Sequence, residues 1–382
     1  MTLDRRLFLG SALALGLPFS RAALAQSGTQ GGPIVAPIRL DDRRITIEAR
    51  LNGKGPFSFV IDTGAQLNAV RQGVADQVGL RKARDVRLNG GLSFPLYSVD
   101  ELLLGGVVRQ ADAAMAGLPG ARLSGDGLLA AGLLTTFDSE LDLDRGQWRV
   151  WPSGSPDRTG FTRLDSSLRE PDLPYLSRRI FAEITFNGAG LKPLLDTGSP
   201  NMLTLDHTVG RRLGLWSDTQ PYVPVRTSGI GGDAQSLARL VRGKAIQVGP
   251  AGYEAPLIVV RPPDAQGPDA ILGLPLLRTL DLSVDRAERA VWVRRNSQAP
   301  KVRTYGGSGL WLEAQGGGVT VAEVGTGSPA AKAGVRVGDV VEGLDFRTAI
   351  ARLNAPFGET LALSLRRGGQ AIPVSFVLAD YL

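Results

Sequence analysis

The chain contains an internal duplication, and no other feature of the sequence constrains its fold as strongly. One copy reads ITIEARLNGKGPFSFVIDTGAQLNAV from Ile45, and the other reads RIFAEITFNGAGLKPLLDTGSPNMLTL from Arg179. Each copy has an alternating strand, an Asn-Gly turn and a second strand that ends in Asp-Thr-Gly. Asn-Gly between alternating apolar runs is a strong signal for a tight β-hairpin. The repeat therefore predicts two copies of one β-rich lobe.

The two copies also close alike. DGLLAAGLL begins at Asp126 and DAILGLPLL at Asp269, and the related segments LDLDRGQWRVW and LSVDRAERAVWV follow them. The order of the elements is kept while the loop lengths differ. A stretch with several prolines separates the copies and is typical of a linker. We therefore expect one lobe over residues 34–152 and the other over residues 160–296.

The composition agrees with an all-β chain and restricts its chemistry. The 382 residues include 49 glycines and 24 prolines, which separate short apolar runs as turns separate strands. Cysteine is absent and His207 is the single histidine. Thiol nucleophiles and cysteine zinc sites are thereby excluded, and a serine–histidine–aspartate triad would depend on His207 alone. We expect hydrolysis by carboxylates, without a metal or a cofactor.

The charge of the chain gives no sign of nucleic-acid binding. The net charge is +6 and the sequence pI is near 9.8. Nucleic-acid recognition requires basic residues that cluster on one face, and here the arginines are scattered through strands and turns. We therefore expect no nucleic-acid partner.

Residues 1–25 have the pattern of a cleaved export signal. A charged start precedes an apolar stretch from Leu7 to Phe19, and small residues follow at Ala23-Leu24-Ala25. The apolar stretch is shorter than the about 20 residues that a membrane span requires. Arg5-Arg6 followed by Leu7-Phe8-Leu9 resembles the twin-arginine signal of bacteria, with a general secretory signal as the alternative. We expect a mature chain from near Gln26 in the bacterial periplasm or secreted, without a stable membrane span.

The Asp-Thr-Gly triplets place Asp62 and Asp196 where an apolar strand ends in a turn. Two carboxylates about 3 Å apart do not both ionise readily, so one ionised and one protonated group can activate a water between them. We expect Asp62 and Asp196 to form such a catalytic pair, which titrates as a unit. Tight turns, exposed amides and hydroxyl groups beside the pair would support it. The residues expected in this role are Thr63, Gly64, Thr197 and Gly198.

Residues from about 34 to 295 resemble a fused aspartic protease of the pepsin and retropepsin type, in which two lobes of one chain replace two subunits. Both triplets match that family's active-site motif, and Ile271-Leu272-Gly273 matches its second motif, which lies behind the active-site loop. The resemblance implies a closed β-barrel in each lobe, a cleft between the lobes, polypeptide substrates, and catalysis without dimerisation. The first lobe departs from the family at Ala130, which stands where the second lobe has Gly273 and implies a small shift.

The resemblance also implies flap hairpins that cover the cleft. In the first lobe the candidate flap runs from Asn89-Gly90-Gly91 to Tyr97. Glycine-rich tips are also typical of plain surface turns, which is the alternative for both lobes. The candidate flap residues of the second lobe are Gly229, Ile230, Gly231 and Gly232.

Residues 305–380 resemble a PDZ domain, a small α+β fold. The stretch from Ser328 to Val335 and the following Gly338-Asp339-Val340-Val341 match its most recognisable part. Pro329 suits the first turn of a short helix and Gly334 its end. The resemblance implies capture of C-terminal peptides by a backbone loop and a strand edge. A domain that only packs on the protease is the alternative. The candidate peptide-binding residues are Gly309, Leu310, Trp311 and Leu312.

The sequence thus predicts an all-β chain of two pseudo-symmetric retropepsin-like β-barrel lobes, followed by a small α+β PDZ-like domain. The predicted function is that of an aspartic endopeptidase, with the PDZ-like domain assisting recognition of substrates or partners. The alternative is a non-catalytic peptide-binding scaffold of the bacterial envelope.

Overall fold

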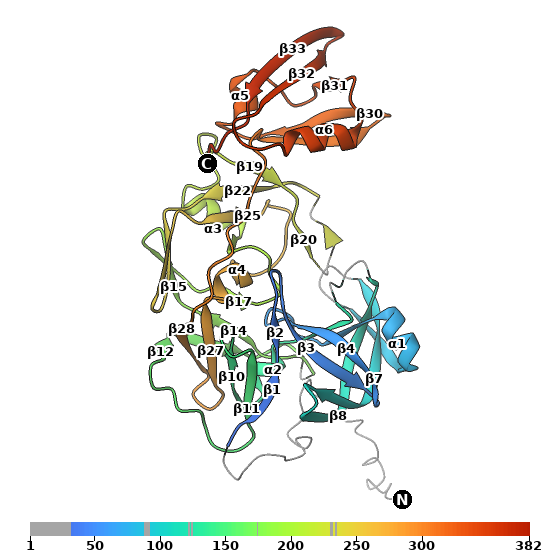
Figure 1. The fold of residues 1–382 in the computed structure, drawn as a ribbon, viewed down its shortest axis with the longest axis vertical. Coiled ribbons are helices and arrows are strands. Elements are labelled where there is room, and N and C mark those ends of the chain that lie inside the picture. Colours follow the sequence, from blue (N-terminus) through green and yellow to red (C-terminus); the bar gives the residue numbers. More distant parts are fainter. Residues whose placement is uncertain are drawn as a thin grey trace, which may run out of the picture. The chain divides into compact units, whose positions relative to one another are not determined.

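The computed structural model describes residues 32–87, 92–120, 123, 125–173, 175–229, 232–233 and 235–382, so the candidate export signal lies outside the described part. This part is mostly β, as predicted (Figure 1). It divides into two compact units, which consist of several chain segments each. The first holds residues up to Phe161, Ser166–Ile180 and Asp281–Trp292, and the second holds Thr162–Asp165, Phe181–Leu280 and Val293–Leu382. No helix in the described part is long and apolar enough to cross a membrane.

The two Asn-Gly hairpins form as predicted. In the first unit, Asn52-Gly53 joins β3 (Ile45–Leu51) to β4 (Lys54–Ile61), with φ of 49° and 77°. In the second unit, Asn187-Gly188 joins β15 (Ile184–Phe186) to β16 (Ala189–Leu191), with φ of 51° and 82°. A two-residue hairpin loop of type I′ needs positive φ at both positions, which asparagine and glycine adopt more readily than other residues.

The first lobe is a closed barrel. Its sheet has the order β2-β3-β4-β9-β5-β8-β7-β6, and an additional pairing of β3 with β7 closes a ring of six strands. Figure 1 shows β3, β4, β7 and β8 of this barrel beside α1. Alternate residues of β3 are buried, as the sequence pattern predicts. The other elements are β2 (Arg39–Leu40), β5 (Ala69–Arg71), α1 (Gln72–Val78), β6 (Arg81–Arg87), β7 (Ser93–Leu104), β8 (Val108–Leu118) and β9 (Gly127–Leu129).

The second lobe repeats this strand order with interrupted strands. Its larger sheet has the order β14-β17-β26-β18-β25-β22-β19, and a smaller sheet has the order β16-β15-β23-β24. These elements are β14 (Arg179–Ala182), β17 (Leu194–Asp196), β18 (Leu203–Leu205), α3 (His207–Arg212), β19 (Val223–Val225), β20 (Ser228–Gly229), β21 (Gly232–Asp233), β22 (Ala238–Arg242), β23 (Ala245–Val248), β24 (Ala251–Glu254), β25 (Leu257–Val260), β26 (Ala270–Gly273) and α4 (Leu274–Leu277).

The interruptions of the second lobe coincide with proline and glycine. Pro193 separates β16 from β17, and Pro256 separates β24 from β25. Proline has no N–H to donate to a strand ladder, and at these two positions the strands are interrupted. At Gly243, between β22 and β23, the amide donates to the Pro256 oxygen at 2.8 Å and so bridges two breaks. The closed barrel predicted for this lobe is therefore present as two sheets rather than one continuous barrel.

A central sheet joins the closing segments of the two copies in the first unit. Its order is β1-β11-β10-β27-β28, and β10 pairs with β27 so that Leu141 lies opposite Leu282. The elements of this region are β1 (Ile34–Pro37), α2 (Gly132–Thr135), β10 (Asp138–Asp142), β11 (Gln147–Trp151), β27 (Leu280–Asp285) and β28 (Ala290–Arg295). β13 (Ser166–Arg169) belongs to the first unit but not to this sheet, and β12 (Thr162–Leu164) begins the second unit.

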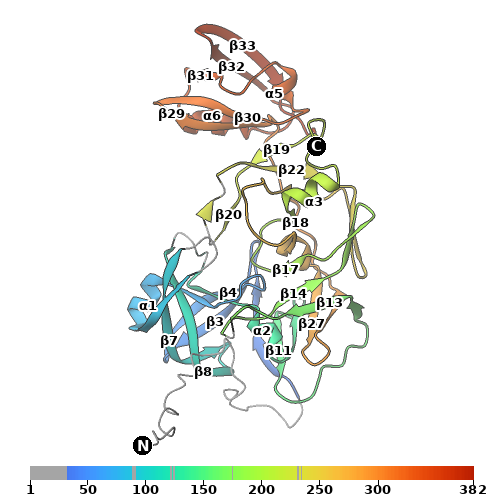
Figure 2. The ribbon, with the colours of Figure 1, turned by 180° about the vertical axis from the view of Figure 1, so that it is seen from behind.

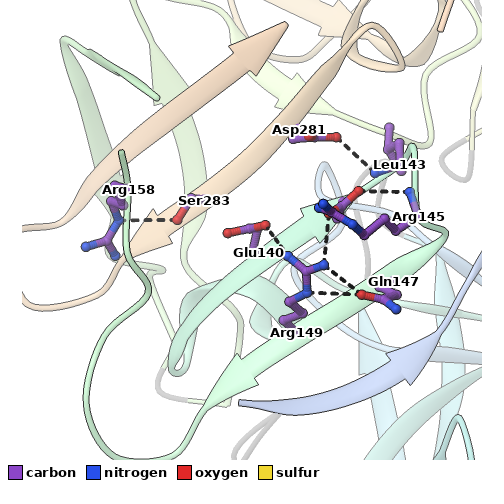
Figure 3. Close-up of polar contacts among 9 residues, drawn as sticks. Glu140, Leu143, Arg145, Gln147, Arg149, Arg158, Asp281 and Ser283 are labelled. Atoms are coloured by element: carbon purple, nitrogen blue, oxygen red, sulfur yellow. Dashed lines mark hydrogen bonds and ion pairs between the residues drawn. The ribbon is translucent and has the colours of Figure 1, made fainter. Parts of the chain in front are cut away.

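The central sheet buries a network of charged side chains (Figure 3). The Arg149 guanidinium donates to Glu140 at 2.8 Å and lies 3.0 Å from the fully buried Asp142 carboxylate. The Leu143 amide donates to Asp281 at 3.0 Å. Burial acts to raise the pKa of Asp142, but hydrogen bonds from Arg145 and the charge of Arg149 outweigh it and hold this pKa below its usual range.

The C-terminal module is an antiparallel sheet with two helices. The sheet has the order β29-β30-β31-β32-β33, so β29 is an edge strand, and Figure 2 shows α6 alongside β29 and β30. Ser328 caps the short helix α5, and Asp345 caps α6. The buried Asp339 accepts two hydrogen bonds of 2.7 Å from Arg367. The elements are β29 (Leu310–Gln315), β30 (Gly318–Val324), α5 (Pro329–Lys332), β31 (Val340–Glu342), α6 (Phe346–Leu353), β32 (Thr360–Arg367) and β33 (Gln370–Val377).

Candidate active site

The first Asp-Thr-Gly triplet forms a tight turn at the end of β4. The Asp62 amide donates to the Leu129 oxygen of β9 at 2.9 Å, which fixes the start of the turn. Asp62 Oδ1 accepts hydrogen bonds from the amides of Gly64 and Ala65, each at 3.0 Å. Thr63 is buried, whereas Asp62 and Gly64 are half-buried. The turn therefore holds the carboxylate in one orientation through two backbone donors.

The second triplet has the same geometry in the second unit. Asp196 ends β17, and its Oδ1 accepts hydrogen bonds from the amides of Gly198 at 2.8 Å and Ser199 at 3.1 Å. Thr197 is buried, like Thr63 in the first triplet. The two aspartates belong to different units, and each is oriented by the backbone of its own lobe. The pairing of the two carboxylates stays a prediction.

Gly273 of the second motif lies behind the second triplet. β26 runs parallel to β17, with Gly273 beside Asp196. A Cβ at Gly273 would overlap the Asn201 oxygen and would lie 2.8 Å from the Ser199 oxygen. The Gly273 amide donates to the Met202 oxygen at 3.1 Å. The backbone that follows the second triplet thus packs directly on residue 273, which explains the glycine there.

The first lobe solves the same packing problem with a different residue. Ala130 occupies the position of Gly273, because Leu129 pairs with Ile61 as Leu272 pairs with Leu195. The Ala130 amide donates at 2.8 Å to the side-chain oxygen of Asn68, which is fully buried. The sequence reasoning missed Asn68. The signal that could have found it is that the two copies differ at both positions together: the first has Asn68 and Ala130, and the second has Met202 and Gly273.

The candidate flap of the second lobe is a short hairpin. β20 pairs with β21, so Ser228 lies opposite Asp233 and Gly229 opposite Gly232. Ile230 and Gly231, which follow Gly229 in the sequence, lie outside the described residues. The hairpin itself was expected, and its role as a flap stays a prediction.

The candidate flap of the first lobe joins β6 to β7, and Arg87 pairs with Ser93 at the last described pair. Asn89-Gly90-Gly91 lies outside the described residues. Tyr97, at the other end of the candidate, lies on β7 and its hydroxyl accepts a hydrogen bond of 2.6 Å from the Gln72 side chain of α1. Tyr97 is therefore fixed against the barrel rather than part of a free loop.

The four candidate peptide-binding residues of the C-terminal module have different surroundings. Gly309 precedes the edge strand β29 and has φ of 75°. Leu310 and Leu312 are buried in the core of the module, so their side chains are not free for a ligand. Trp311 is half-buried, and the Arg226 guanidinium lies over its ring. Only the backbone of this strand remains as a candidate binding edge.

The module packs on the second lobe within the second unit. The Tyr222 hydroxyl donates to Glu323 at 2.6 Å, and Arg226 pairs with Glu313 at 2.9 Å. Burial and the neighbouring Glu323 raise the pKa of Tyr222. A second group of contacts joins the end of the chain to the lobe, where Arg242 binds Asp380 at 3.0 Å. These contacts agree with the alternative that the module packs on the lobe.

Comparison with known proteins supports one class of function. Residues 47–135 and 182–276 each match the model of the aspartyl protease family. A similar solved structure is that of a retropepsin-like aspartic protease from Rickettsia conorii, with 16% sequence identity and a TM-score of 0.26, over 35% of this chain and 90% of that chain. The chain matches no curated protein sequence. The two family matches, one in each repeat, support an aspartyl protease.

Proposed function

We propose that the protein is an aspartic endopeptidase, in which Asp62 and Asp196 activate a water that attacks a peptide bond. The observation that carries this proposal is the matching geometry of the two turns. In each, the aspartate Oδ1 accepts two backbone amides, from Gly64 and Ala65 in one copy and from Gly198 and Ser199 in the other. Each turn lies inside a segment that matches the aspartyl protease family.

The proposed reaction needs both carboxylates in different protonation states. The ionised member of the pair takes a proton from the water as the water oxygen bonds to the scissile carbonyl carbon. The protonated member donates a hydrogen bond to the carbonyl oxygen and so stabilises the charge that develops there. The C–N bond then breaks as the amine receives a proton from the pair. The pair shares its protons, so neither role is assigned to one residue.

Single substitutions of the two aspartates test this proposal. Asp62→Asn and Asp196→Asn keep the shape of the side chain and remove its ability to ionise. We expect each to lower the rate of peptide cleavage by about 100–10,000-fold. The rate is measured in a digest of a peptide library over pH 3–8. Asp172→Asn, on the exposed linker, is the matched control and should leave cleavage unchanged. Full activity in either active-site variant would refute the proposal.

We propose further that residues 305–380 form a PDZ-like module that binds the C-terminal ends of polypeptides. The support is an edge strand, β29, which lies beside α6 and follows a glycine of positive φ. An extended peptide can add to such an edge through backbone hydrogen bonds. Titration of the full chain with a decapeptide library tests this. Peptides with a free carboxylate should bind and their amidated copies should not; equal binding of both would contradict it.

We also propose export to the periplasm by the twin-arginine route, on the pattern of residues 1–25. Mass spectrometry of the protein from the native host tests this. A mature chain that starts near Gln26 supports export, and an intact Met1 refutes cleavage. Replacement of Arg5-Arg6 by lysines should block export if the twin-arginine route is used. Unchanged export of that variant would indicate the general secretory route.

A further inference from the structure

We propose that Asn68 is a positioning residue of the first active-site turn, and that it replaces the glycine found in the second lobe. This inference rests on the proposed function, because positioning of Asp62 matters only if Asp62 takes part in catalysis. The two lobes present the same turn with two different supports. Their comparison shows what each support does.

In the second lobe the support is direct contact between two backbones. The Met202 oxygen accepts the Gly273 amide at 3.1 Å, and the Ser199 oxygen accepts the Leu274 amide at 3.1 Å. The close approach leaves no room for a Cβ at residue 273, which would overlap the Asn201 oxygen. This lobe therefore needs glycine at that position, because any side chain would push the active-site loop away.

In the first lobe the neighbouring contact is unchanged. The Ala65 oxygen accepts the Ala131 amide at 3.1 Å, as Ser199 accepts that of Leu274. The two lobes differ in the hydrogen bond to the preceding amide. In the first lobe the Asn68 side-chain oxygen accepts the Ala130 amide at 2.8 Å. Asn68 follows Asp62 at the same spacing at which Met202 follows Asp196. A side-chain oxygen thus does at residue 68 what a backbone oxygen does at residue 202.

The side chain also explains why alanine is accepted at residue 130. A side-chain acceptor reaches beyond the backbone by the length of its Cβ and Cγ, which leaves space for the alanine methyl group. Asn68 is itself held firmly, because it is fully buried and its backbone oxygen accepts the Ala116 amide of β8 at 2.9 Å. Without the side-chain oxygen, the buried Ala130 amide would lose its acceptor.

Asn68 occupies a fully buried position, where an amide side chain is unfavourable unless it forms hydrogen bonds. Among the residues that the structure describes, its Nδ2 atom has no hydrogen-bond partner. A buried polar atom without a partner is unfavourable, so a core position would normally carry an apolar residue such as the Met202 of the other lobe. The hydrogen bond that the Asn68 side-chain oxygen accepts from the Ala130 amide explains why this position carries asparagine. We infer that residues 68 and 130 act as one unit.

The test exchanges this unit for that of the second lobe. The variants are Asn68→Met, Ala130→Gly and the double variant with both. Asn68→Met should lower kcat by about 10–100-fold with KM changed less than about 3-fold, because misplacement of a catalytic group by about 1 Å has an effect of this size. Ala130→Gly alone should change kcat less than about 3-fold, since the Asn68 bond remains. The double variant should recover kcat to within about 3-fold of the wild type.

A stability control separates positioning from simple loss of packing. Val99→Ala removes buried methyl groups from β7 of the same barrel, outside the active-site turn, and it should lower Tm while leaving kcat at 25 °C unchanged. A kcat for Asn68→Met within about 3-fold of the wild type, or a double variant no better than Asn68→Met, would overturn the inference. Failure of the proposed function looks different, because the wild type would then be as inactive as Asp62→Asn. In that case the Tm values of the variants are compared instead. If the Tm changes of Asn68→Met and Ala130→Gly simply add in the double variant, the inference is overturned.

Discussion

Asp142 and Arg149 form an ion pair of 3.0 Å inside the central sheet, with the carboxylate fully buried. We expect Asp142→Asn to lower the free energy of unfolding by on the order of 3 kcal/mol, because it leaves the half-buried Arg149 charge without one of its partners. Thermal unfolding at pH 7 measures this. The exposed pair of Lys82 and Asp85 is the control, and Asp85→Asn should change stability by less than about 0.5 kcal/mol. Equal effects of the two substitutions would contradict the expectation.

The same pair gives a pH dependence. The pKa of Asp142 is lower in the folded protein than its ordinary value of 3.8. A carboxyl group with a lowered folded pKa stabilises the protein above its unfolded pKa, and this stabilisation is lost as the pH falls through the folded pKa. The wild type should therefore lose Tm steeply below about pH 4. Asp142→Asn should lose less over that range, and parallel curves for the two proteins would exclude this role of Asp142.

Gly273 tests the packing behind the second triplet. Gly273→Ala should destabilise the protein by about 1–3 kcal/mol and reduce cleavage, because its Cβ meets backbone atoms that cannot rotate away. Gly73→Ala in α1 is the matched control. Its Cβ would meet no atom within 4 Å, and alanine is the better helix residue, so this variant should be neutral or slightly more stable. Thermal unfolding and the peptide digest report both effects, and a wild-type Tm for Gly273→Ala would contradict the prediction.

The contact between the module and the second lobe depends on Tyr222. Tyr222→Phe removes the hydrogen bond to Glu323 and should lower the free energy of unfolding by about 1–2 kcal/mol, with kcat unchanged. Lys332→Ala, an exposed residue of α5, is the control and should have no effect. Denaturant unfolding measures the difference, and stability equal to that of the control would show that this contact does not stabilise the module.

The raised pKa of Tyr222 also predicts that the folded protein loses stability in alkali. This pKa is raised above the ordinary value of 10.0, because burial and Glu323 disfavour the phenolate. A group with a raised folded pKa stabilises the protein fully below its unfolded pKa, and this contribution is lost as the pH rises toward the folded pKa. The wild type should therefore lose stability above about pH 10 more steeply than Tyr222→Phe. The same slope in both proteins would contradict the prediction.

Local signals in the sequence predicted a large part of the fold. The Asn-Gly dipeptides fix two hairpins because few other residues adopt positive φ at both turn positions. The duplication predicted that one strand order would occur twice, and it does. The interruptions of the second barrel at Pro193 and Pro256 were not predicted, although proline carries that signal. The hydrophobic pattern of a strand does not show where its ladder is broken.

Residues whose role depends on distant partners could not be predicted in this way. No local pattern marks Asp142 and Arg149 as partners, and only the pairing of β10 with β11 makes them a buried ion pair. Tyr222 and Glu323 belong to different parts of the sequence, and no local pattern links them. Asn68 follows an active-site motif like an ordinary loop residue. Its role depends on the approach of Ala130 from another strand.

A crystal structure of the mature protein with a transition-state mimic of the pepstatin type tests the central claim most directly. We predict that the carboxylates of Asp62 and Asp196 lie about 3 Å apart and both contact the hydroxyl group of the mimic. Carboxylates on separate surfaces, well beyond hydrogen-bonding distance of each other, would contradict the assignment of this chain as an aspartic endopeptidase.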